Sequence, residues 1–243
     1  MSEINECREN PAAYAYRLES WVEMYAGDVR YRDEDVPVLT TEGVSALKQA
    51  ISLLKRTPSA PPLRFSPGLF SAAQLHCENL GTKGGASHQG DLGLRERLAK
   101  FGHWGGKVVE ALDFGSIAAR EVVASLLIDD GLPTREHRKA LISPDYRLIG
   151  VGFGPHEVYK SVCTVLLATK FSEDASATQL SMPPGMLLGT WEARGWLEGA
   201  VRLNCEITSD MENEVMVKRV VKMWEMEDGS ERRTEEVIYD ALA

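Results

Sequence analysis

Cysteine is scarce in this sequence. Its 243 residues include four cysteines, Cys7, Cys77, Cys163 and Cys205, and no two of them form a C-x-x-C pair. Structural zinc sites are usually built on such closely spaced pairs, so the sequence does not support one. An even number of cysteines permits disulfides, but the density is low for a disulfide-stabilised domain, which favours reduced thiols.

Long apolar runs and clusters of basic residues are also missing. No stretch of about 18 apolar residues occurs, so the sequence predicts no membrane-spanning helix. There is no run of five Lys or Arg residues, and the formal net charge is -9, which argues against nucleic-acid binding. Residues 1–19 are charged and lack the apolar segment of a secretory signal. This favours a cytoplasmic location, or a secreted one if the N-terminus has been trimmed.

Apolar periodicity predicts helices near the N-terminus. Residues 3–26 carry an apolar stripe with a helical period, which Asn10-Pro11 interrupts near its start. Residues 41–55 form a second amphipathic segment, with Thr41 in the N-cap position. Residues 27–40, between the two helices, are charged and we expect them to be irregular.

A third helix is predicted after a proline-rich connector. Ser66 is a suitable N-cap, and Pro67 follows at the first helical position, where proline is tolerated. The pattern continues to about Leu80. His76 and Cys77 lie on its apolar face, so we expect both to be core residues rather than ligands.

Residues 146–169 have the alternation of a β-hairpin. In its second strand one face carries Val162, Thr164, Leu166 and Ala168, and the other carries Cys163, Val165 and Leu167. Both sets are mostly apolar. We therefore expect this strand to be covered on both sides.

The most informative stretch is LLIDDGLPTREHRKALI, from Leu126 to Ile142. Asp130-Gly131-Leu132-Pro133 predicts the end of a helix that has Ser116 as its N-cap, and Thr134 is a candidate N-cap for a short second helix. At 100° per residue, Asp129 extends the buried row of the first helix. A buried carboxylate needs a partner, because desolvating it unpaired is costly.

The segment EHRKALISPDYRLIGVGFGPHEVYKSVC, which starts at Glu136, resembles the His-Arg motif and the following hairpin of the CAP superfamily, also called SCP domains. That superfamily includes the cysteine-rich secretory proteins, antigen five of wasp venom and the plant pathogenesis-related proteins. The family's first-helix pattern is resembled by Asn5, Arg8, Asn10-Pro11 and Tyr14. The resemblance covers about residues 1–171 and implies an α/β fold, a three-layer α-β-α sandwich.

The resemblance also implies a cavity lined by four residues. These are His88, Glu110, Asp129 and His137. SHQGDLGLRERLAKFG matches the family segment that carries the first histidine. Glu110 is what remains of a Gly-Glu-Asn motif, since Val109 and Ala111 replace the glycine and the asparagine. Asp129 stands where the family has a glutamate, and is one methylene shorter.

Two imidazoles and two carboxylates suit a divalent transition metal, zinc first, with His88 and His137 as ligands. The same four residues could instead form a hydrogen-bonded polar cluster that needs no metal. Because the family motifs are altered at Val109, Ala111 and Asp129, we expect weak zinc binding or none.

The last third of the chain shows no family motif. Residues 172–185 are rich in Ser, Ala and Pro and predict a linker. Residues 186–243 predict a three-stranded antiparallel β-meander, with Asp228-Gly229 as the turn between its last two strands. The first strand alternates between apolar and polar residues, so one face should cover something. We expect this extension to be an attachment surface for a protein partner.

Three functional hypotheses remain open. The first is a non-enzymatic CAP module that needs no cofactor and binds a protein or a small apolar ligand such as a lipid or sterol. The second is an intracellular structural component in which the CAP fold is a scaffold. The third is a zinc-dependent hydrolase with Glu110 as base. No H-E-x-x-H motif or recognisable nucleophile–base pair supports the hydrolase, and the complete tetrad favours the first hypothesis.

Overall fold

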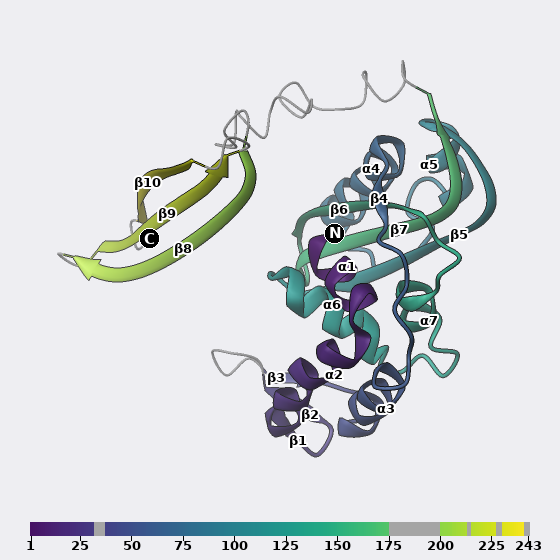
Figure 1. The fold of residues 1–243 in the computed structure, drawn as a ribbon, viewed down its shortest axis with the longest axis horizontal. Coiled ribbons are helices and arrows are strands. Elements are labelled where there is room, and N and C mark those ends of the chain that lie inside the picture. The colour runs from purple at the N-terminus through teal and green to yellow at the C-terminus, as the bar shows by residue number, and fades with distance from the viewer. Residues whose placement is uncertain (32–36, 175–199, 213–214, 227–229, 241–243) are drawn as a thin grey trace. The chain divides into compact units, whose positions relative to one another are not determined.

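The chain forms two compact units, Met1–Ser181 and Met182–Ala243. The computed structural model describes the backbone of residues 1–31, 37–174, 200–212, 215–226 and 230–240, and the side chains of residues 1–31, 37–174 and 230–233. Figure 1 labels the elements of the first unit, which are α1 (Ser2–Glu9), α2 (Pro11–Glu19), η1 (Ser20–Met24), β1 (Tyr25–Ala26), β2 (Val29–Tyr31), β3 (Pro37–Leu39), α3 (Val44–Leu54), β4 (Arg64–Phe65), α4 (Pro67–Lys83), α5 (Leu94–Ala99), β5 (Gly102–Phe114), α6 (Ala119–Ile128), α7 (Glu136–Ile142), β6 (Leu148–His156) and β7 (Lys160–Glu173).

The predicted first helix is in fact two helices and a short 3-10 turn. Asn10 separates α1 from α2, and its side chain accepts a hydrogen bond from the Ala13 N–H at 3.0 Å. Pro11 starts α2, where its missing N–H costs nothing. The sequence predicts an irregular segment at residues 27–40, but β2 and β3 lie there and form a small antiparallel sheet with β1, in the order β1-β2-β3.

Helix α4 begins as predicted. The Ser66 side chain accepts a hydrogen bond from the Leu69 N–H, and Pro67 is the first helical residue. The helix continues to Lys83, one turn beyond the predicted end, and stops at Gly84 in the left-handed conformation. His76 and Cys77 are both fully buried, as the apolar stripe indicated.

The main sheet has the strand order β4-β6-β7-β5, with β4 parallel to β6 and the other pairs antiparallel. Cys163, Val165 and Leu167 of β7 pack in one core with α1, α2, α3, α6 and α7. Leu166 and Ala168 face the other way and pack against α4 and α5. The predicted three-layer α-β-α sandwich is therefore confirmed, and Figure 1 shows helices on both sides of the sheet.

Two glycines of β6 allow α4 to lie directly on the sheet. A Cβ atom added to Gly150 would come within 2.1 Å of the Leu69 backbone, and one added to Gly152 within 2.5 Å of the Ala73 backbone. Any side chain at either position would push the helix away. These glycines therefore set the distance between α4 and the sheet.

Three residues predicted as N-caps do not cap their helices. They are Thr41, Ser116 and Thr134, and the helices begin later, at Val44, Ala119 and Glu136. In each case a carboxylate binds backbone N–H groups at or next to the start of the helix. The carboxylates belong to Asp130, Glu121 and Asp129. Asp130 is 88 or more positions away from the N–H groups that it binds, so no local pattern could reveal this contact, whereas Glu121 is the third residue of α6 itself.

The second unit contains the predicted three-stranded antiparallel sheet. Its strands are β8 (Ala200–Glu212), β9 (Val215–Met226) and β10 (Glu231–Asp240), in the order β10-β9-β8. The predicted Asp228-Gly229 turn and residues 186–199 lie outside the described residues. Strand β7 runs to Glu173, so the predicted linker of residues 172–185 begins inside a strand, and its residues from 175 onward are also outside the described part.

Three of the four cysteines have described side chains. Cys7, Cys77 and Cys163 are free and buried, which agrees with the expectation of reduced thiols. Burial raises the pKa of Cys7 to about 12 and that of Cys77 to about 11, so both thiols are protonated at neutral pH. Among the described residues, no helix is long and apolar enough to cross a membrane.

Candidate functional site

The four predicted site residues form two histidine–carboxylate pairs, and Glu110 is the carboxylate of the first pair, with His88. It lies on β5, and its side chain is only 2% exposed. The Nδ1 atom of His88 lies 3.0 Å from one carboxylate oxygen of Glu110, and the Arg97 guanidinium from α5 pairs with the other. Arg97 also donates to the backbone carbonyls of His88 and Leu92, at 3.3 and 2.6 Å. One buried cation therefore holds both the carboxylate and the loop that carries the histidine.

These contacts decide the charge of Glu110. Burial would raise the pKa of its carboxyl, but the hydrogen bond from His88 and the charge of Arg97 outweigh burial and lower it. The carboxylate is therefore ionised at neutral pH and can only accept hydrogen bonds. It follows that Nδ1 of His88 carries the proton, which leaves its Nε2 as the unprotonated nitrogen when the ring is neutral.

The loop before α5 is fastened to α4 by exposed groups. The Asp91 N–H donates to Asn79 Oδ1 at 2.9 Å. The Asp91 carboxylate in turn accepts hydrogen bonds from the Asn79 amide and the Lys83 ammonium. The His88 side chain, within this loop, is 52% exposed.

Asp129 is the centre of the second half. It follows α6 directly and adopts the left-handed conformation, with φ of 54°. One carboxylate oxygen lies 2.9 Å from His137 Nδ1, and the other accepts from the backbone N–H of Arg138 at 3.2 Å. Asp129 is buried, as expected. Its shorter side chain reaches His137 because the chain leaves the helix at this residue.

The structure brings all four predicted residues together, although 49 positions separate the two histidines (137 − 88). The rings of His88 and His137 lie 6.4 Å apart between centroids, with a tilt of 43°. In each ring Nδ1 is bonded to a buried carboxylate. Neither Nε2 atom makes a hydrogen bond to any described residue.

The donor set fits a metal only in part. Histidines that bind metals commonly donate their other N–H to a carboxylate, as both histidines do here. Two imidazoles on one tetrahedral zinc, with Zn–N bonds of about 2 Å, would have ring centres roughly 5 Å apart. The rings would have to approach each other from 6.4 Å. Within the described part of the chain, no group of three or more His, Cys, Asp or Glu side chains could hold a metal ion.

Sequence reasoning missed two residues of the site. Arg97 was not singled out, although its spacing from Leu94, Leu98 and Phe101 puts a cation on the apolar row of a short helix. His76 was assigned to the core only. Its ring is fully buried, with Nε2 3.7 Å from Glu110 Oε1, beyond the length of a hydrogen bond. Burial, more than any charge, lowers the pKa of His76 to about 4, so the ring is neutral.

The arginine of the His-Arg motif has a structural role. Arg138 is buried and donates to the carbonyls of Leu127 and Ile128 at the end of α6, and to Ala46 of α3 at 3.1 Å. The last carbonyls of a helix have no partner within the helix, and a cation beside them is favoured by the helix dipole. Arg138 thus joins α3 to the last two residues of α6, which precede Asp129 in the chain.

An α-β-α sandwich in which two histidine–carboxylate pairs face each other defines the class of domain to which this chain can be compared. The chain belongs to the CAP family, because the sequence model of the family "CAP: Cysteine-rich secretory protein family" matches residues 3–167.

No curated protein sequence matches the chain. One solved structure, an extracellular protein containing an SCP domain from Bacillus anthracis str. Ames, is similar at 22% sequence identity with a TM-score of 0.35. The match covers 46% of this chain and 35% of that protein, so this chain spans about a third of its length.

Proposed function

We propose that this protein is a non-enzymatic CAP module whose ligand contacts the Nε2 atoms of His88 and His137. The observation that carries this proposal is the way the tetrad divides its hydrogen bonds. Both carboxylates are occupied by Nδ1 of a histidine and by one further donor, Arg97 or the Arg138 backbone. The two remaining Nε2 atoms are oriented by these bonds and free to bind.

The environment of Glu110 favours binding over hydrolysis. A general base works best when its pKa is near the operating pH and when it can reach the water that it activates. The pKa of Glu110 is lowered, its side chain is 2% exposed, and its carboxylate is paired with Arg97. A carboxylate in this state is a weak base, so we do not assign it a catalytic role.

Zinc is the ligand whose chemistry best matches two oriented imidazoles. His88 and His137 would hold the ion, while water or a bound partner would supply the other ligands. Bound zinc would supply a positive charge that a carboxylate of a partner could contact. Because this chain contributes two donors among its described residues, we expect weak binding unless a partner completes the site.

Zinc titration by calorimetry tests the proposal. The wild type, the double variant His88→Ala/His137→Ala and the control His103→Ala, which changes an exposed histidine of β5, are compared at pH 7.5 and pH 5.5. We expect heat of binding at the higher pH, a weaker signal at the lower pH and none in the double variant, because histidine binds metal only when neutral. A signal that survives the double substitution at both pH values would place the metal elsewhere. No signal at either pH would reduce the tetrad to a structural polar cluster.

A protein partner, a small apolar ligand and a scaffold role stay predictions. The boundary between the two compact units suggests a test of whether the first unit folds without the second. We expect the chain without residues 182–243 to remain soluble and to unfold cooperatively. Aggregation of this fragment would mean that the second unit completes the core of the first.

A further inference from the structure

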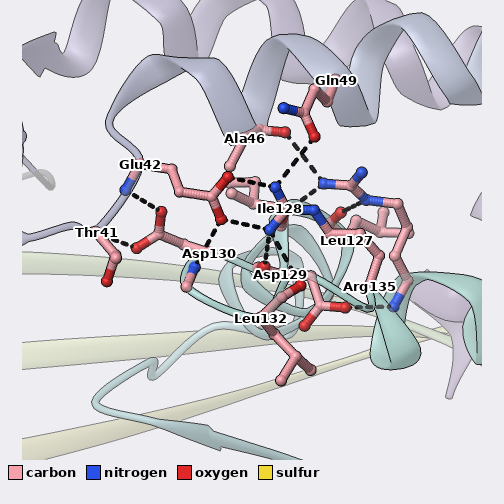
Figure 2. A network of polar contacts seen from close by, with 12 residues as sticks. Thr41, Glu42, Ala46, Gln49, Leu127, Ile128, Asp129, Asp130, Leu132 and Arg135 are labelled. Atoms are coloured by element: carbon pink, nitrogen blue, oxygen red, sulfur yellow. Dashed lines mark hydrogen bonds and ion pairs between the residues drawn. The ribbon is translucent and has the colours of Figure 1, made fainter.

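Arg135 joins two parts of the chain beside the binding site (Figure 2). Its side chain is 12% exposed, and its guanidinium donates to both oxygens of Glu42 and, at 3.1 Å, to Gln49. The same guanidinium donates to the backbone carbonyl of Asp129 at 2.7 Å and to that of Leu132 at 3.2 Å. One cation therefore connects the start of α3 with the turn between α6 and α7.

This turn is held in an unfavourable backbone conformation. In the described part of the chain, three residues other than glycine have positive φ, and two of them, Asp129 at 54° and Arg135 at 51°, bound the turn. Such a conformation is costly for a residue with a Cβ atom and persists only where surrounding contacts enforce it. Arg135 donates to the carbonyl oxygen of Asp129, and this oxygen belongs to the peptide plane whose orientation sets ψ of Asp129. Arg135 therefore fixes this dihedral angle.

Hydrogen bonds in both directions between this turn and the residues before α3 support the same conformation (Figure 2). The Asp130 carboxylate accepts from the N–H groups of Thr41 and Glu42, at 2.6 and 2.9 Å. The Glu42 carboxylate accepts from the Gly131 N–H at 3.0 Å. The hydrogen bond from Arg135 is the main cause that lowers the pKa of Glu42, which keeps this carboxylate charged. The turn cannot relax without breaking charged contacts on both sides.

The conformation of Asp129 controls the proton on His137. An ionised carboxylate only accepts hydrogen bonds, so its contact with His137 requires the proton on Nδ1 and leaves Nε2 as the acceptor. If Asp129 turned away, nothing in the described contacts of His137 would favour the Nδ1–H form over the Nε2–H form. An Nε2–H nitrogen cannot bind a metal.

We propose that Arg135 is a positioning residue of the binding centre: by holding Asp129 in the left-handed conformation it keeps His137 in the Nδ1–H form, with Nε2 free for the ligand. This inference rests on the proposed function only in taking Nε2 of His137 as a binding group. The state of the His137 ring is a property of the protein alone and can be measured without any ligand.

The first test is nuclear magnetic resonance of the histidine rings in the full chain. The 15N shifts of a ring distinguish its protonated from its unprotonated nitrogen, and His137→Gln assigns the signals. At a pH above the range in which imidazole titrates, the wild type should show His137 as Nδ1–H, and Arg135→Ala should show a substantial share of Nε2–H. His88, whose carboxylate lies on β5, should not change. Arg17→Ala, which removes an exposed arginine from its pair with Glu6, is the matched control and should leave both rings unchanged.

A second variant and a second readout keep the inference falsifiable. Arg135→Lys can still neutralise Glu42, but a single ammonium cannot bridge Glu42 and two carbonyls, so the His137 change should be partial. If Arg135→Ala does not fold, the same measurements are made on Arg135→Lys. With added zinc, Arg135→Ala should bind about 10-fold more weakly than the wild type, the usual size of an outer-shell effect. An unchanged His137 ring in every folded variant would overturn the role of Arg135. Absence of zinc binding in the wild type, with the ring change present, would overturn the proposed function instead.

Discussion

Each half of the site holds a histidine against a buried carboxylate, but the two carboxylates are stabilised in different ways. In the His88 half, the carboxylate of Glu110 is neutralised by the side chain of Arg97, and the histidine lies on an exposed glycine-rich loop. In the His137 half, the carboxylate of Asp129 is held by a backbone N–H, and the histidine lies on a helix with its side chain 19% exposed. The first half depends on a buried ion pair and the second on a backbone conformation.

This difference predicts where each half is vulnerable. A buried ion pair responds strongly to the loss of one charge and to acid, because the charge left behind has no solvent to stabilise it. A strained turn responds to changes in backbone preference and keeps its geometry through many contacts. The following experiments separate the two behaviours, beginning with the largest expected effect.

Removing the buried cation should damage the protein most. Arg97→Met leaves the Glu110 carboxylate buried without its main partner, and should lower the free energy of unfolding by about 3–5 kcal/mol. Denaturant unfolding of the full chain measures the change. Arg17→Met is the control, because it breaks an exposed Arg–Glu pair and should cost less than about 1 kcal/mol. The double variant Arg97→Met/Glu110→Gln should recover part of the loss; a double variant as unstable as Arg97→Met would show that packing of Arg97, rather than its charge, is what matters.

Acid should act on the His88 half through His76. Because burial lowers the pKa of this ring to about 4 from its ordinary value of 6.5, the unfolded chain binds a proton between these pH values that the folded chain does not. The stability contributed by His76 is therefore complete above pH 6.5 and lost as the pH falls towards 4, in total about 3 kcal/mol. His76→Leu should abolish this part of the pH dependence, whereas His103→Leu, at an exposed position, should keep it.

Glu110 provides an internal check on that experiment. Its pKa is lowered from the ordinary 4.5, so the stability that it contributes is present above pH 4.5 and is lost only as the pH falls through the folded value. The Glu110 effect therefore begins where that of His76 ends. A wild-type stability curve that is flat between pH 6.5 and 4 would contradict the assignment to His76.

The His137 half should respond to backbone preference. Asp129→Asn and Asp129→Ala both remove the charge, but asparagine tolerates the left-handed conformation and alanine does not. We therefore expect Asp129→Ala to be less stable than Asp129→Asn by about 1 kcal/mol in denaturant unfolding. At Glu110, which lies in a regular strand, the alanine and glutamine variants provide the comparison, and no backbone preference of this kind should separate them. Equal stability of the two Asp129 variants would show that the turn is not strained.

The same contrast explains what the sequence could predict. The layers follow from local patterns: the alternation in β7 indicated a strand covered on both faces, and Ser66-Pro67 marked the start of α4. The positions of His88 and His137 came from family motifs, which describe order along the chain. Neither source contains the partner of a buried charge, so Arg97 and the full role of His76 were missed.

The errors have a common physical cause. Thr41, Ser116 and Thr134 satisfy the local rules for an N-cap, but the carboxylates of Asp130, Glu121 and Asp129 bind backbone N–H groups near the starts of these helices instead. Asp129 was placed on a helical row, although the helix ends there because Arg135 and Asp130 hold the next residues. Such contacts join positions as far apart as Glu42 and Arg135 and leave no periodic signal in the sequence.

The smallest expected effect concerns the loop that carries His88. Asp91 ties this loop to α4 through an ion pair with Lys83 whose side chains are 57% and 54% exposed. Exposed pairs contribute little, so Asp91→Asn should leave the free energy of unfolding nearly unchanged. The loop itself should nevertheless loosen, because the bonds of Asp91 to Lys83 and Asn79 attach it to α4. Hydrogen exchange of the amides in residues 85–93 should therefore become faster, while residues 136–142 of α7 should exchange as in the wild type.

Asp145→Asn is the matched control, since it breaks a similarly exposed pair with Lys107 outside both halves. Faster exchange in α7 as well would mean that the two halves are held as one unit, and unchanged exchange in the loop would mean that Arg97 alone fixes His88.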